Sequence, residues 1–372
     1  MPTKPGWTDI DFIGAYNAAN STDWKTSLAW FLWVPSAGKY WIAVDMFAGD
    51  GVTESPGSWA IIDPITRSIE GFSDESGFTH TTIDEIAYSE SDGCVWTRGR
   101  NSLFVGFYYT KYASDGSVLV QSPSVQGSLT HITASPVTGQ LYGWQNNSPS
   151  PGYQIKTVDG TTGELGSAVI TSSDPIAVTF VFDGAGDVWY RTNSGPTSAK
   201  VWRYDVAGAT SYEALSVSGT TDLPYLWLYN SRDDTILLSY PSGSPKKIKW
   251  INVSDYSVAE TVEFGSDWSN SIRSFDEFDT YRGKVWCWIS AYYGLITIEA
   301  YALVDPADWD AEPEYYEWGA YGGGYAVTNG YQHEVCVDAA VYDPAEIYYT
   351  RIWPGSVASR RWVNVNINMR RR

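Results

Sequence analysis

The chain has 372 residues, of which 43% are hydrophobic and 16% aromatic, and it contains 34 Gly and 18 Pro. Aromatic residues favour β-strands and Gly and Pro favour turns, so the composition predicts an all-β fold, which can reach this length as one domain. The formal net charge of −19 would repel phosphates and argues against sequence-independent binding of nucleic acid.

The negative charge is unevenly distributed along the chain. Residues 351–372 contain six arginines and no Asp or Glu, whereas residues 1–350 carry a charge of −25 from 18 basic and 43 acidic groups. A basic end on an acidic body suits contact with an acidic neighbour. A solvated tail that keeps the chain in solution is the alternative.

The three cysteines are widely spaced, at Cys94, Cys287 and Cys336. This number and spacing match neither a disulfide framework nor a zinc site, so we expect small buried hydrophobic side chains. The first residues contain no apolar segment, and no apolar run approaches the roughly 18 residues of a membrane helix. We therefore expect synthesis in a cytoplasm without a signal peptide, and no insertion into a membrane.

A short pattern of four residues recurs along the chain. Its first residue lies in a turn before a strand, and its fourth residue is large and either apolar or aromatic. The glycine that opens most copies is expected in a turn with a positive φ. The aromatic residue is expected to fill the wedge between neighbouring sheets. The copies start 46 to 62 residues apart and comprise Gly38–Trp41, Gly93–Trp96, Gly139–Tyr142, Gly186–Trp189, Asp234–Leu237, Gly283–Trp286 and Ala345–Tyr348.

Each copy lies within four short strands, of which the first precedes the turn, the third ends near an Asp and the fourth is more polar. This unit is typical of a propeller blade. We predict one seven-bladed β-propeller over residues 1–372, in which the alternating segment 8–16 pairs with the last blade and closes the ring. The blades are expected near residues 25–72, 83–123, 129–173, 175–219, 223–265, 272–319 and 333–372.

One copy, Asp183-Gly-Ala-Gly-Asp-Val-Trp-Tyr-Arg191, is followed by Val201-Trp-Arg-Tyr-Asp205. It resembles the repeats of the streptogramin-lyase-like and sensor-propeller families, and as a pattern the resemblance covers most of the chain. The resemblance implies the propeller architecture. It does not imply the lyase activity, because the sequence has no matching His/Glu cluster, and His80 and His131 are expected in loops or at the rim.

Patterns for catalysis or metal binding are weak. The segment Ser89–Trp96 is similar to the Asp-box hairpin of sialidases, but Ser91 replaces the Asp of the box and Val95 replaces its Thr. Acidic residues cluster at 276–279 and 308–312, where paired carboxylates would suit a glycosidase and solvated loops are the simpler explanation. Acidic residues elsewhere lack the spacing of an EF-hand. We expect no catalytic residue, cofactor or metal, and a glycan-active enzyme remains the alternative.

Two insertions, at residues 47–57 and 305–332, lengthen the regular spacing. The second alternates aromatic residues with acids and glycines, which is typical of recognition loops, although such a loop can also pack on a blade edge. We predict a partner-binding surface from these aromatic residues and the arginine-rich end. Its members are Trp309, Tyr315, Tyr316, Trp318, Tyr321, Tyr325, Tyr331, Arg360, Arg361, Arg370, Arg371 and Arg372.

In architecture and composition the chain resembles the nozzle and hub propellers of bacteriophage tails. This resemblance implies a non-enzymatic structural component of a virion that contacts other virion proteins, copies of itself in a ring, or a glycan on the host surface. A carbohydrate-binding propeller and a scaffolding propeller in a cellular complex are the other possibilities. Neither nucleic acid nor a membrane is expected as a partner.

Overall fold

The structure is a computed structural model. It describes residues 7–10, 17–19, 21–22, 26–34, 36–47, 58–62, 69–74, 82–100, 106–123, 126–127, 129–147, 152–220, 222–230, 233–240, 247–263, 272–279, 284–293, 296–304, 314–315, 319–322, 335–338 and 348–352. Apart from a helical turn at residues 17–19, the regular elements in these ranges are β-strands. Within these ranges, no helix is long and apolar enough to cross a membrane.

The described strands form seven sheets, which we number in chain order. Sheet 1 consists of β2 (Thr26–Val34), β3 (Lys39–Phe47), β4 (Ser58–Ile62) and β5 (Ile69–Asp74), and sheet 2 of β6 (Thr82–Ser89), β7 (Cys94–Arg100), β8 (Phe107–Tyr112) and β9 (Val118–Gln121). Sheet 3 consists of β10 (Thr130–Ala134), β11 (Leu141–Asn147), β12 (Gly152–Val158) and β13 (Leu165–Ser172), and sheet 4 of β14 (Ile176–Phe182), β15 (Val188–Gly195), β16 (Ser198–Asp205) and β17 (Thr210–Ser218). Sheet 5 consists of β18 (Tyr225–Asn230), β19 (Thr235–Tyr240), β20 (Lys247–Asn252) and β21 (Val258–Glu263). Sheet 6 consists of β22 (Ile272–Asp279), β23 (Lys284–Tyr293), β24 (Ile296–Val304), β25 (Glu314–Tyr315) and β26 (Gly319–Gly322). Sheet 7 consists of β27 (Val335–Asp338), β28 (Tyr348–Ile352) and β1 (Trp7–Ile10).

Sheets 1 to 6 are antiparallel, and in each the first four strands pair in chain order. Such four-stranded units, each with two edges, are consistent with a β-propeller. Burial decreases outward across a sheet, since the first five residues of β15 are buried whereas β17, the fourth strand of the same sheet, begins with four exposed residues. The expected all-β fold and the more polar fourth strands are therefore confirmed.

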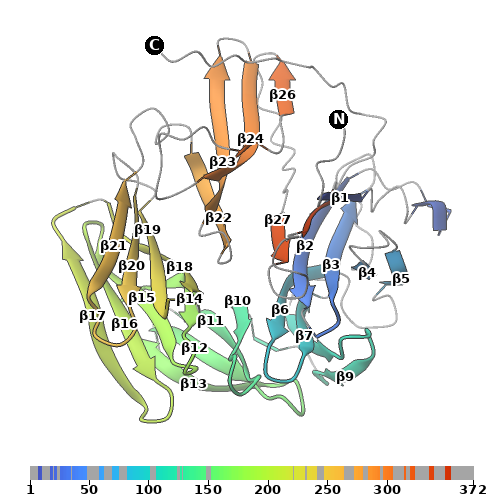
Figure 1. Ribbon diagram of the computed structural model, residues 1–372. Helices are drawn as coiled ribbons and strands as arrows, with labels where there is room; N and C mark the ends of the chain where they lie inside the picture. The colour runs from blue at the N-terminus through green and yellow to red at the C-terminus, as the bar shows by residue number, and fades with distance from the viewer. Residues whose placement is uncertain are drawn as a thin grey trace.

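The sheets are arranged with their first strands toward a common centre (Figure 1). Strand β2 contacts β6, β6 contacts β10, β10 contacts β14 and β14 contacts β18, so consecutive sheets meet at their first strands. Strand β27 of sheet 7 contacts both β22 and β2, which places it between sheets 6 and 1. The first strands thus lie innermost and the fourth strands outermost.

The N-terminal strand β1 pairs with β28 in a parallel arrangement, with Trp7 opposite Tyr349 and Ile10 opposite Ile352. Residues from the two ends of the chain therefore share sheet 7. Residues 353–372 of the last predicted blade and the remainder of the segment 8–16 lie outside the described residues.

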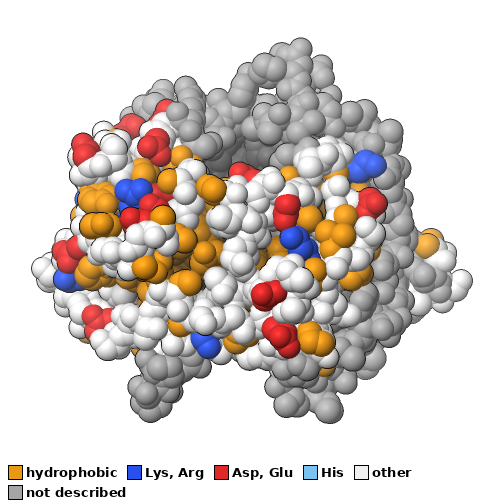
Figure 2. Space-filling view, turned by 90° about the horizontal axis from the view of Figure 1, so that it is seen from below, with side chains coloured by type: hydrophobic (Ala, Val, Ile, Leu, Met, Phe, Trp, Pro, Cys, Tyr) orange, Lys and Arg blue, Asp and Glu red, His pale blue; other side chains and the backbone are white. Residues whose placement is uncertain are grey.

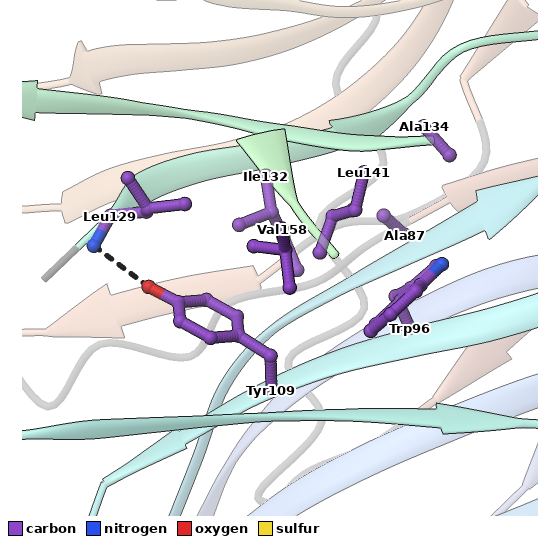
Figure 3. Packing of buried hydrophobic residues seen from close by; sticks show 8 residues of the cluster. All are labelled: Ala87, Trp96, Tyr109, Leu129, Ile132, Ala134, Leu141 and Val158. Atoms are coloured by element: carbon purple, nitrogen blue, oxygen red, sulfur yellow. Dashed lines mark hydrogen bonds between the residues drawn. The ribbon is translucent and has the colours of Figure 1, made fainter. Parts of the chain in front are cut away.

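Apolar side chains from two consecutive sheets make each described core cluster. Figure 3 shows the cluster between sheets 2 and 3, where Trp96 from β7 and Tyr109 from β8 face Ile132 of β10, Leu141 of β11 and Val158 of β12. A side chain of this size contributes about 3 kcal/mol when it is removed from water.

The aromatic residue of the repeat lies in the corresponding cluster of each of sheets 1 to 4. These residues are Trp41, Trp96, Tyr142 and Trp189, and the most exposed of them, Tyr142, retains 5% of its accessible surface. The prediction that this residue fills the wedge between sheets is confirmed.

The four described repeat glycines have a positive φ, for example 68° at Gly139 and 84° at Gly186. Three of them, Gly93, Gly139 and Gly186, also pack on the equivalent turn of the preceding sheet, since a Cβ at Gly139 would lie 2.7 Å from the Ser91 Oγ. The degenerate copy retains the backbone conformation without glycine, because Asp234 has a φ of 51°. Its carboxylate accepts a hydrogen bond from the Tyr229 hydroxyl at 3.0 Å.

The repeat copy at residues 183–191 forms a buried polar network. Asp183 is fully buried and accepts hydrogen bonds from the backbone N–H groups of Ala185 and Asp187, both at 3.0 Å, and from the Trp189 indole at 2.9 Å. The Arg203 guanidinium lies 3.3 Å from Asp183 and 2.7 Å from Asp187. Burial by itself would lower the pKa of Arg203. The hydrogen bond to Tyr256 and the negative charges of Asp183 and Asp187 outweigh this effect, so the pKa of Arg203 is raised. These motif residues therefore hold the turn and the strand pair together.

We expect Gly139→Ala to lower the free energy of unfolding by about 1–3 kcal/mol, because alanine disfavours the positive φ and its methyl group would meet the side chains of Ser89, Ser91 and Asp92. The matched control is Gly160→Ala, since a Cβ at Gly160 meets nothing within 4 Å and its φ lies outside the left-handed region. Urea denaturation of both variants measures the difference. Equal stability of the two variants would contradict the role assigned to the repeat glycine.

Candidate functional site

The innermost strands carry irregularities near their starts. In sheets 2 to 6 the register between the first and second strands shifts within the first few residues of the first strand. In sheet 3 this shift leaves His131 as an extra residue between Thr130 and Ile132, with a φ of 51°. A bulge redirects a side chain, and a left-handed conformation at a residue other than glycine is strained, so both features mark a candidate functional site.

The redirected His131 ring bridges two other sheets. Its Nε2 lies 3.2 Å from the carbonyl oxygen of Phe180 in β14, and its Nδ1 lies 3.9 Å from Glu85 Oε1 in β6. Because a carbonyl oxygen can only accept, Nε2 carries the hydrogen and the Nδ1 of the neutral ring is an acceptor. The His131 side chain is 32% exposed and that of Glu85 is 20% exposed, so neighbouring groups enclose most of both side chains.

Arg98 lies beside this pair and joins sheet 2 to sheet 3. Its guanidinium donates to the backbone carbonyl of Leu129, lies 3.4 Å from Glu85 Oε2 and stacks over the Phe107 ring at 5.1 Å. The Tyr109 hydroxyl completes the contact, because it donates to the Gly127 carbonyl at 3.0 Å and accepts from the Leu129 N–H at 2.9 Å. Burial raises the pKa of Tyr109, so this hydroxyl stays protonated.

The electrostatic surroundings keep His131 neutral near pH 7. Burial of the ring lowers its pKa, and the positive charge of Arg98 lowers it further, while the hydrogen bond to Phe180 has the opposite effect. A neutral imidazole with a defined tautomer can accept a hydrogen bond or a proton at Nδ1. Glu85, Arg98 and His131 therefore form a candidate site, which we call the axial cluster because its histidine and carboxylate lie on innermost strands.

A second arginine occupies the equivalent repeat position. Arg98 and Arg191 each follow the repeat glycine by five residues, and Arg191 donates to the backbone carbonyl of Pro224, just before the next sheet begins. The Arg191 guanidinium lies 4.1 Å from the centroid of the Tyr225 ring. Nearby, Lys247 forms an ion pair with Asp222 at 2.9 Å. The repeated spacing was a signal in the sequence that the motif analysis missed.

The residues predicted to bind a partner are mostly beyond the described part of the chain. Tyr315 lies in β25 and Tyr321 in β26, and both strands pair with β24. Part of the insertion thus supplies backbone hydrogen bonds to sheet 6, and partner binding by these residues stays a prediction. The other predicted contacts lie outside the described residues: Trp309, Tyr316, Trp318, Tyr325, Tyr331, Arg360, Arg361, Arg370, Arg371 and Arg372.

Two other expectations concern single residues. Cys94 is buried, with 7% of its surface exposed, which confirms the prediction for that cysteine. His131 was expected to open a strand at a loop or rim position, and it is the second residue of β10, the innermost strand of sheet 3. Among the described residues, no group of three or more His, Cys, Asp and Glu side chains is placed to hold a metal ion.

Neither a protein-family model nor a curated protein sequence matches this chain. Among solved structures, the chain is similar to an uncharacterized protein, lmo1340 from Listeria monocytogenes EGD-e, with 12% identity over 84% of this chain and 86% of that chain and a TM-score of 0.50. TolB from Acinetobacter baumannii has 13% identity over 82% and 69% of the two chains, with a TM-score of 0.42. A luciferin-regenerating enzyme has 11% identity over 73% and 91%, with a TM-score of 0.41. At these identities the likeness concerns the fold alone.

We expect the stability of the protein to fall as the pH decreases through about 6.5, and His131→Asn to weaken this dependence. The folded state holds the His131 pKa below its usual 6.5, so in acid the unfolded chain binds a proton that the folded chain resists. Asn is chosen because it adopts a left-handed φ more readily than most residues. The free energy of unfolding of the unaltered chain and of His131→Asn is measured between about pH 5 and 8. The difference between the two pH profiles gives the contribution of His131. Parallel pH profiles would show that His131 is not held neutral by the fold.

Proposed function

We propose that the chain is a seven-bladed β-propeller closed by its N-terminal strand, and that it is a non-enzymatic structural and interaction component of a bacteriophage virion, in the tail. The observation that carries the proposal is the pairing of β1 with β28, because it joins the two ends of the chain within one sheet of the ring. Closure of this kind protects sheet edges and gives a rigid body with loops on two faces.

Polar contacts between sheets support the rigidity of this body. Arg98 ties sheet 2 to the residue before sheet 3, and Arg191 ties sheet 4 to the residue before sheet 5. Both arginines are buried, so the loss of either contact would leave a buried guanidinium N–H group without this acceptor. These contacts restrict rotation of one sheet against the next, which suits a component that has to keep its shape in an assembly.

The described surface offers apolar contact area. Figure 2 shows hydrophobic side chains gathered on the side of the molecule that holds sheets 4 and 5 in Figure 1. The exposed large hydrophobic residues of these two sheets are Tyr212, Tyr225 and Val258. Together with the six arginines of residues 351–372 on a strongly acidic chain, this surface favours head-to-tail contact between neighbouring copies.

We expect the double variant Asp9→Cys/Arg351→Cys to form an intramolecular disulfide under mild oxidation. These positions are opposite each other in the β1–β28 pair, and neighbouring strands are separated by about 4.8 Å, within the Cα range of a disulfide. Mass spectrometry of the oxidised monomer detects the bond, and its thermal midpoint should rise relative to the reduced form. Each single variant is the control for pairing with a native cysteine. If only disulfides between chains form, the proposed closure is wrong.

The proposed location is tested on particles. Antibodies against the purified chain should label the tail of virions of the phage that encodes it, and native mass spectrometry of the purified chain should show a defined oligomer or a complex with a tail protein. A chain that is absent from purified virions would overturn the virion role.

A further inference from the structure

The fourth strand of sheet 4, β17, is the longest outer strand of sheets 1 to 5. It has nine residues, whereas the fourth strands of the other four sheets have four to eight. Figure 1 shows β17 at the rim of the molecule. Within the described ranges β17 pairs with β16 alone, so the backbone N–H and C=O groups on its other side have no strand partner. Such a row of donors and acceptors matches the edge of another extended strand.

Most of β17 is exposed. Six of its nine residues are exposed, including the first four. Tyr212, the third residue, retains 46% of its accessible surface. A tyrosine at such a position offers a large rigid contact area at a small cost in side-chain entropy, so β17 combines free backbone groups with an aromatic contact.

The usual protection of an edge strand is weak in β17. Soluble proteins protect their sheet edges with charged residues, proline, short strands, bulges or a covering segment. The sequence of β17 contains no Pro, Lys or Arg, and its one charged residue, Glu213, pairs with Lys200 at 2.6 Å. A single register shift at Ala214 interrupts the pairing with β16, and four residues on each side of it pair regularly.

The other outer strands of sheets 1 to 5 have more of these protective features. Strands β5 and β21 each carry two acidic residues among six, and β9 is only four residues long. In β13 two register shifts interrupt the pairing with β12, and the Leu165 N–H donates to the Gln126 side chain of the neighbouring sheet at 3.0 Å. Among these five edges, β17 is therefore the one most open to another strand.

The local charge allows two copies of the chain to approach at β17. The charged residues of β16 and β17 are Lys200, Arg203, Asp205 and Glu213. Two basic and two acidic groups leave this strand pair without net charge, whereas the whole chain carries −19. A contact between two strongly acidic surfaces would be opposed by repulsion, and a contact through β17 avoids it.

We infer that β17 is a self-association site, at which the β17 strands of two copies pair in an antiparallel arrangement and join two four-stranded sheets into one. The same edge is used on both copies, so the contact is isologous and closes at two copies. This inference goes beyond the proposed function, whose head-to-tail contact joins different surfaces and does not close at two copies.

Val258 offers a matched control for a substitution at Tyr212. Each side chain retains 46% of its accessible surface, and each lies on the fourth strand of its sheet, Tyr212 on β17 and Val258 on β21. Tyr212→Lys and Val258→Lys therefore add the same charge at equal exposure. Only Tyr212→Lys adds it at the β17 edge, where the two copies would bring the new charges together. Ser218→Lys tests the other end of β17 with a second exposed position.

The experiment is analytical ultracentrifugation of the purified chain over a range of concentrations, with amide hydrogen exchange on the same samples. We expect an equilibrium between monomer and dimer, and protection of residues 210–218 that increases with concentration while that of residues 258–263 does not. The dissociation constant of the dimer should rise about tenfold or more in Tyr212→Lys and in Ser218→Lys and stay unchanged in Val258→Lys, because like charges oppose pairing across strands. Thermal melting of each variant shows whether it is folded.

Three results would overturn the inference: the chain stays monomeric at all concentrations, the folded Tyr212→Lys and Ser218→Lys variants dimerise as well as the unaltered chain, or Val258→Lys weakens the dimer equally. Larger assemblies that persist unchanged in both β17 variants would show that copies meet elsewhere. They would overturn the β17 contact and leave the head-to-tail contact of the proposed function intact. Conversely, a β17 dimer of a chain that is absent from purified virions would remove the virion role alone.

Discussion

The fold depends on the packing of one sheet face against the next, and the aromatic residue three positions after each repeat turn dominates that contact. Trp41 stacks on Trp59 of its own sheet at 4.7 Å, and both rings contact Tyr112 of the following sheet. Because the equivalent residues of sheets 1 to 4 each lie in a cluster shared with the following sheet, one local pattern suffices to order these sheets around a centre. The side chains at the interface determine the angle between neighbouring sheets, so their size constrains how the sheets are arranged.

Buried polar groups give these apolar interfaces their specificity. An apolar wedge alone would tolerate sliding of one sheet along the next, whereas a buried arginine that donates to one particular carbonyl does not. Arg98 and Arg191 make this contact at equivalent positions, with Leu129 and Pro224 respectively. Asp183 has a comparable role within sheet 4, since three hydrogen-bond donors and the Arg203 guanidinium converge on its carboxylate. The geometry of such groups therefore restricts the register between sheets.

Register shifts occur at the innermost strands and also between the third and fourth strands of sheets 1 to 5. Register shifts near the starts of five first strands contrast with the uninterrupted pairing of β3 and β4 or of β23 and β24. His131 is strained in its backbone and engaged by groups from sheets 2 and 4. Strain of this kind persists only where surrounding contacts over-determine it, and here those contacts come from neighbouring sheets.

The sequence by itself determined the strands, their grouping in fours, the repeat turns and the buried aromatic residues. These features follow from local periodicity and from the conformational freedom of glycine, and even Asp234 was placed correctly by spacing. Only the tertiary structure revealed the bulge at His131, the strands β25 and β26 within an insertion, and the position of Lys249 over the Tyr240 ring. A bulge depends on the pairing with a neighbouring strand, and Lys249 reaches Tyr240 only because two strands lie side by side. Such contacts join residues whose spacing along the chain has no fixed period, so no pattern in the sequence could show them.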